Sequence, residues 1–195
     1  MGLQQGADKA SVVLVGESLN LCQSLCSAYS TISDDVFKIK GFVEKIIDLM
    51  QFKVSEDEAQ KKDLEDLLKV NSMKCVSQFQ FYGGPDKQQK LVKEMKYIKS
   101  LVISIGCAGG TEHEKNYQTL HALYAFISLV DSIYGKISWC LPNIHLLKDL
   151  REELQENGGN EEIDANCFSC LGQSHYEIGG VAIRLKNYEL WKNNQ

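Results

Sequence analysis

The stretch YQTLHALYAFISLVDSI, residues 117–133, decides the fold of this chain. Its apolar residues recur at helical spacing and cover more than half of a helical circumference. Thr111 and Glu114 stand three residues apart just ahead of it, which is the spacing of a capping box at a helix start. A helix with so much apolar surface belongs among other helices. The inward positions that we expect are Tyr117, Leu120, Leu123, Tyr124, Phe126, Ile127, Val130 and Ile133.

Amphipathic stretches on both sides of this segment predict the other helices. Upstream, apolar residues three and four apart run through residues 11–30, 34–50, 55–82 and 91–105. Downstream, a shorter stretch of the same kind occupies residues 142–157, with a proline near its start. The sequence therefore predicts an all-α fold, a compact helical bundle of about six helices around the central segment.

Pairs of glycines punctuate the helical stretches. Gly83-Gly84, Gly109-Gly110 and Gly158-Gly159 each follow an amphipathic stretch, where glycine is the usual residue that ends a helix. The distances between the pairs are unequal and the residues around them do not recur, so the sequence shows no internal repeat.

The C-terminal residues follow a different pattern, and we expect residues 1–160 to form the bundle and residues 161–195 to form an appendage that packs on it or extends it. Around Gly179-Gly180 the chain alternates between polar and apolar residues, as in a short β-hairpin with a two-residue glycine turn. The same residues fit a helix with Ile178, Ala182 and Leu185 on one face. We prefer the helix because the preceding residues are helical.

Composition and charge narrow the function. The 195-residue chain has a net charge of -5 at pH 7, which argues against binding to the phosphate backbone of nucleic acids. Seven cysteines, an odd number in a chain of this size, indicate reduced thiols in a cytoplasmic compartment. The longest uncharged apolar run, residues 117–130, is shorter than the roughly 20 residues that span a bilayer, so a membrane partner is possible but not favoured.

Cys167, Cys170 and His175 form the sharpest local motif, C-x2-C-x4-H, with an aromatic residue after the first cysteine. Thiolates and imidazoles are the ligands that zinc prefers. Over residues 167–175 the spacing resembles the retroviral type of zinc knuckle, whose closing cysteine would fall on Gly180 in this chain. The resemblance implies three of the four ligands of a zinc site.

The same motif has other interpretations. Water, Cys140 or His145 could supply the fourth ligand, a C-x-x-C pair can be redox active, and cysteines three residues apart can also pack in a core on one helix face. Zinc is the one cofactor that the sequence suggests; otherwise we expect none.

No complete catalytic signature is present, so the sequence favours a protein that is not an enzyme. His113 and His121 are eight residues apart, whereas the H-E-x-x-H motif of metalloproteases places its histidines four apart. Cys107 has its preceding glycine one position away, where a nucleophile elbow requires two.

Aromatic residues near the ends of predicted helices are candidates for contact with a partner protein. Phe81, Tyr82 and Trp191 have this position, and aromatic side chains often anchor protein interfaces.

The leading hypothesis is a non-enzymatic interaction module, an adaptor or regulator, that binds a partner through a helical groove or surface. One alternative is a membrane-active bundle similar in architecture to the four-helix domains of cell-death executors. The other is a small zinc or thiol protein that uses the C-x2-C-x4-H motif.

Overall fold

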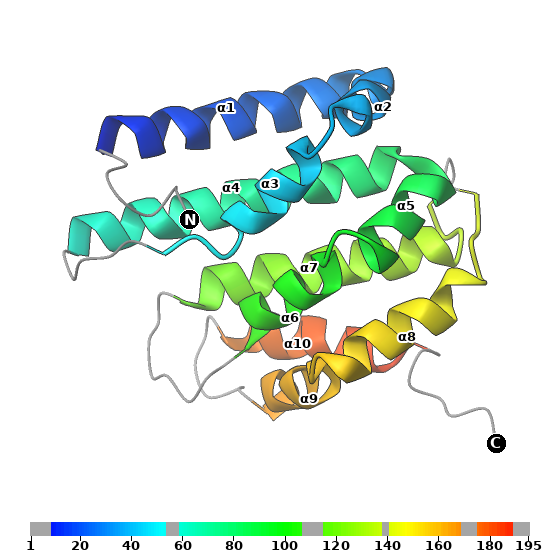
Figure 1. The fold of residues 1–195 in the computed structure, drawn as a ribbon. Coiled ribbons are helices and arrows are strands. Elements are labelled where there is room, and N and C mark those ends of the chain that lie inside the picture. The colour runs from blue at the N-terminus through cyan, green and yellow to red at the C-terminus, as the bar shows by residue number, and fades with distance from the viewer. Residues whose placement is uncertain (1–8, 54–58, 107–114, 138–140, 169–174, 189–195) are drawn as a thin grey trace.

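The all-α prediction is confirmed by the computed structural model, which describes residues 9–53, 59–106, 115–137, 141–168 and 175–188 (Figure 1). Ten helices and no strands occur within these residues. The helices are α1 (Lys9–Ala28), α2 (Ser30–Lys38), α3 (Phe42–Leu49), α4 (Ala59–Tyr82), α5 (Gly84–Lys93), α6 (Tyr97–Ile105), α7 (Lys115–Ile133), α8 (Leu146–Glu156), α9 (Gly159–Phe168) and α10 (His175–Lys186).

The helices are arranged in two layers. The helices α1, α4, α7 and α10 stack side by side in that order and form the first layer (Figure 1). All four run in the same direction (Figure 1). Between α1 and α4, for example, Gly16 contacts Asn71 and Ser27 contacts Gln78, in the same order along both helices. We call this the long-helix layer. The second layer consists of the paired shorter helices, α2 with α3, α5 with α6 and α8 with α9, which return the chain to the start of the next long helix.

The backbone therefore repeats where the sequence does not. Three times a long helix is followed by two shorter ones, as in an α-solenoid, where each unit packs on its neighbours. Stacking of this kind requires an apolar face on each helix but no particular residues at matching positions.

The predicted number of about six helices is too low, because two of the predicted helices are broken. Residues 34–50 are divided between α2 and α3 at Gly41, which has φ of 75°. Residues 91–105 are divided between α5 and α6 at Lys96, which has φ of 56°. A left-handed residue cannot continue a right-handed helix, and it reverses the direction of the chain locally.

The C-terminal residues form two further helices. Gly158, with φ of 72°, ends α8, and α9 begins directly after it. The stretch around Gly179-Gly180 is helical, within α10, rather than a hairpin. Both helices pack into the hydrophobic core of the preceding helices, to which they contribute Ile163 from α9 and Ile178, Ala182 and Leu185 from α10.

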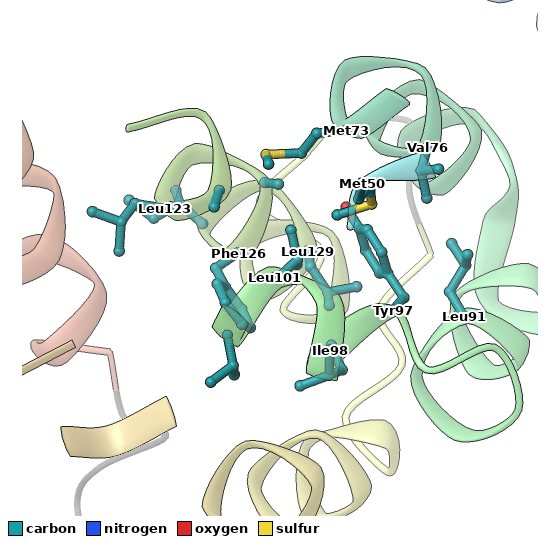
Figure 2. Packing of buried hydrophobic residues seen from close by; sticks show 14 of the residues in the cluster. Met50, Met73, Val76, Leu91, Tyr97, Ile98, Leu101, Leu123, Phe126 and Leu129 are labelled. Carbon is teal, nitrogen blue, oxygen red and sulfur yellow. The ribbon is translucent and has the colours of Figure 1, made fainter. Parts of the chain in front are cut away.

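The centre of the core lies where α6 packs on α7 (Figure 2). Ile98 and Leu101 of α6 lie beside Phe126 and Leu129 of α7, and all four side chains are buried. Ile127, Val130 and Ile133 are also buried, as expected for the central segment. Burial of each such side chain contributes about 1.5–3 kcal/mol to folding.

For two residues of α7, the prediction that the side chain points into the core is wrong. Tyr117 and Tyr124 are exposed, and 44% of Tyr124 is accessible to solvent. The buried face of α7 is narrower than its apolar pattern suggests, because a helix within one layer has neighbours on three sides and leaves the fourth side open.

The first helix lies at the edge of the long-helix layer. It packs mainly on α4 and α2, and buries Val12, Leu19 and Cys26. Its outward side is also apolar: Leu14 is 68% exposed and Leu21 is exposed as well. No helix within the described part of the chain is both long and apolar enough to cross a membrane.

Candidate binding surface

Three hollows lie on the side of the long-helix layer that faces away from the shorter helices. Their linings come from α1, α4, α7 and α10 and from the residues that follow α7, with no contribution from the second layer. We call this side of the layer the open face. Tyr117 and Tyr124 of α7 stand on it and line hollows between α7 and α4.

The first hollow has a volume of about 380 Å³ and lies between α1, α4 and α7. Met73 forms a buried part of its lining, and the rings of Phe81 and Tyr82 meet edge to face with their centres 5.1 Å apart. Among the described residues, its lining is Gln23, Ser27, Met73, Lys74, Ser77, Gln78, Phe81, Tyr82, His121, Tyr124, Ala125 and Ser128. These described lining residues include one ammonium group and no carboxylate.

His121 is the titratable group of this hollow with the strongest perturbation. Burial, with a smaller effect of the nearby Lys74 charge, lowers the pKa of His121 to about 4. The ring is therefore neutral at pH 7. It packs edge to face against Tyr117, with ring centres 4.3 Å apart. The buried Nε2 atom has no hydrogen-bond partner among the described residues.

Lys74 connects the first hollow to a second one along α4. Its Nζ atom donates to the hydroxyl oxygen of Tyr117 at 3.3 Å and lies 5.4 Å from the centre of that ring. The neighbouring hollow, of about 260 Å³, shares Lys74 and is lined at its other end by Asp63 and Asp66. From Asp63 to Tyr82 the two hollows follow α4 for about 28 Å, at 1.5 Å per residue.

The third hollow, of about 730 Å³, lies between α7 and α10. Asp131 is its electrostatic centre: its carboxylate accepts from Tyr188 and pairs with Arg184 at 3.1 Å and Lys136 at 3.8 Å. The ammonium group of Lys136 also lies 4.1 Å from the centre of the Tyr188 ring. Gly180 contributes to the lining, where a Cβ atom would meet nothing within 4 Å.

Two of the three predicted partner-binding residues lie together on the open face. Phe81 and Tyr82 both line the first hollow at the C-terminal end of α4. Trp191 lies outside the described residues.

The predicted zinc ligands are only partly described. Cys167 is half-buried at the end of α9 and packs against the core. Cys170 lies outside the described residues, as does the side chain of His175. Within the described ranges, no group of three or more His, Cys, Asp or Glu residues has an arrangement that could hold a metal ion. The zinc site therefore stays a prediction.

Sequence reasoning missed Tyr117, His121 and Tyr124 as surface residues. Their spacing of three and four residues places them on one face of α7. That face carries two phenols and an imidazole, whereas the buried positions nearby carry aliphatic residues, Phe126 and the small hydroxyl residue Thr119. The polar atoms on these rings were the available signal.

Comparison with protein-family models, with curated proteins and with solved structures returned no match to this chain.

Proposed function

We propose that the protein is a non-enzymatic interaction module that binds a helical segment of another protein on its open face. The observation that carries the proposal is the gathering of three hollows on one side of a single helix layer, with exposed tyrosines between them. In α-solenoids the stacked helices likewise provide an extended surface for a partner.

The dimensions of the surface favour a protein segment. The two hollows along α4 extend for about 28 Å, the length of a helix of about 19 residues. Their lining combines aromatic rings, a methionine and hydrogen-bonding side chains, which is the composition of protein interfaces. Amphipathic helices bind in grooves of this kind through apolar residues at every third or fourth position.

The charges along α4 indicate the chemistry of the partner helix. Asp63 and Asp66 at one end favour a basic residue, and Lys74 in the middle favours a carboxylate. At the other end, Phe81, Tyr82 and Tyr124 favour an apolar side chain. The partner is therefore an amphipathic helix with a basic end and an apolar end.

A display library of amphipathic helical peptides, selected on the full chain, tests this function. Peptides that bind the unmodified protein are measured again on Tyr124→Lys and on the matched control Tyr29→Lys. Tyr29 is 61% exposed and lines none of the three hollows, so its substitution introduces the same charge elsewhere. We expect Tyr124→Lys to weaken binding at least about tenfold, as for an interface anchor, and Tyr29→Lys to leave it unchanged.

Equal affinity of both variants for the selected peptides would place the binding site elsewhere and overturn the proposal. If the library yields no peptide that binds the protein, the proposal of a helical partner is overturned as well. Vesicles with anionic lipid form a parallel arm: leakage of their contents in the absence of peptide would favour the membrane-active alternative instead.

A further inference from the structure

Three cysteines meet where α1 packs on α4. Cys26 and Cys75 are completely buried, and Cys22 is half-buried at the edge of the core. The two hydrogen bonds between α1 and α4 that involve Gly16 and Ser27 lie on either side of Cys22, and this register sets Cys22 opposite Cys75 on α4. None of the three lines a hollow on the open face.

We propose that Cys22 and Cys75 are a redox-active pair, which peroxide converts to a disulfide that joins α1 to α4. The two residues come from different helices that pack closely along their length. Two thiols that face each other between packed helices form a disulfide once their sulfur atoms approach to about 2.05 Å. Within the described residues, no group of three or more His, Cys, Asp or Glu residues, these thiols included, is arranged to hold a metal ion.

The electrostatics of the cluster distinguish an attacking thiol from a resolving thiol. The hydrogen bond with Cys75 lowers the pKa of Cys22 to about 7, against the opposing effect of burial. The same hydrogen bond, followed by burial, raises the pKa of Cys75, and burial raises the pKa of Cys26. Cys22 is therefore the thiol that is partly ionised near neutral pH, and it is also the one that solvent reaches.

The reaction proceeds in two balanced steps. The Cys22 thiolate attacks one oxygen of hydrogen peroxide, the O–O bond breaks, and hydroxide leaves and takes up a proton to form water. Cys22 is then a sulfenic acid. Cys75 loses its proton and attacks the Cys22 sulfur, so that the S–S bond forms and a second hydroxide leaves as water. Two electrons pass from the two sulfur atoms to the peroxide.

The first step prepares the second. Contact with Cys22 is the largest cause of the raised pKa of Cys75, and the Coulombic effect of the Cys22 thiolate adds to it. Conversion of Cys22 to an uncharged sulfenic acid removes that charge. The pKa of Cys75 then falls, and its thiol ionises more readily for attack.

Treatment of the reduced full-length protein with hydrogen peroxide tests the pair. Trypsin cleaves after lysine, so Cys22 lies in the peptide of residues 10–38 and Cys75 in that of residues 75–87. We expect these two peptides to be recovered as one linked species that a reducing agent separates. Two fewer cysteines should react with iodoacetamide after denaturation. The bond closes a loop of more than 50 residues and should raise the Tm by about 10 °C.

Substitutions identify the partners. Cys22→Ala and Cys75→Ala should abolish the linked peptides, whereas Cys26→Ala, in the same tryptic peptide as Cys22, should leave them intact. Circular dichroism verifies that each variant folds; if Cys75→Ala does not fold, the half-buried Cys22→Ala decides the result. Loss of the link in Cys26→Ala would overturn the pairing. A peroxide-treated protein with all thiols still reactive would overturn the proposal itself.

Discussion

His121 occupies a position where its charged form is disfavoured, and this has a consequence for the pH dependence of stability. Its pKa is about 4 in the folded protein and 6.5 without burial. Between these two values the unfolded chain binds more protons than the folded chain. The contribution of neutral His121 to the free energy of unfolding is therefore complete above pH 6.5 and is lost as the pH falls toward 4.

We therefore compare the unmodified protein with His121→Gln. At 1.36 kcal/mol per pKa unit the shift corresponds to about 3 kcal/mol, and partial exposure of the ring reduces the expected effect to about 1–2 kcal/mol. The free energy of unfolding in urea, measured for both proteins at pH 7 and pH 4.5, should fall more for the unmodified protein. Parallel losses in the two proteins would show that His121 does not titrate differently on folding.

Tyr124 shows how far residue-level prediction from the sequence extends. Its place in the helical pattern is the same as that of the buried Ile127, and both were assigned to the core. Whether a residue of this pattern is buried or exposed depends on which helices surround α7, and the positions of those helices are set by the tertiary structure. Phe81 and Tyr82 were identified correctly as neighbours on a helix end, because Gly83-Gly84 marks that end in the sequence.

At the scale of the helix, Gly180 and Gly41 provide a matched pair for testing backbone conformation. At both positions a Cβ atom would meet nothing within 4 Å. Gly41 has φ of 75°, whereas Gly180 lies inside α10 with no positive φ. Gly180→Ala should stabilise the protein by about 0.5–1 kcal/mol through helix propensity. Gly41→Ala should destabilise it by about 1–2 kcal/mol because alanine is strained in the left-handed region.

Thermal unfolding of the two variants measures this difference. A stabilising effect of alanine at both positions would mean that the turn between α2 and α3 tolerates another conformation. A loss of stability at Gly180 would instead show that the hollow beside α10 requires an uncovered backbone at that position.

Helix boundaries reveal a limit of sequence patterns. The apolar spacing continues through Met95 and Ile98, so it gives no sign that α5 ends at Lys93 and that α6 begins at Tyr97. Lysine at position 96 is not a residue type that suggests left-handed backbone, and the break is imposed by packing. The short helix α9 was missed because it begins at Gly159, the second residue of a glycine pair, and continues with polar residues.

At the scale of the whole molecule, the all-α class follows from the spacing of apolar residues, but the two-layer arrangement does not. Parallel long helices require connections that return along the full length of the layer, and the pairs of short helices supply them. The open face follows from the same arrangement, because the described helices cover only one side of the long-helix layer. Neither property has a counterpart in local sequence, so the candidate binding surface could be predicted only as individual aromatic residues.

The order of stacking also determines how cooperatively the molecule unfolds. In a structure of this kind stability is close to a sum over neighbouring units, so an end unit can open while the centre stays folded.

Leu19→Ala on the edge helix α1 should remove about 2–4 kcal/mol of packing and accelerate amide hydrogen exchange in α1 while leaving α7 protected. Phe126→Ala, at the centre, should accelerate exchange in every described helix. Equal acceleration by Leu19→Ala in α1 and α7 would show that the stack unfolds as one unit. Because α1 and α10 are the two end helices of the layer, we expect unfolding to begin at one of these edges and the lifetime of the folded chain to depend on how firmly the edges are held.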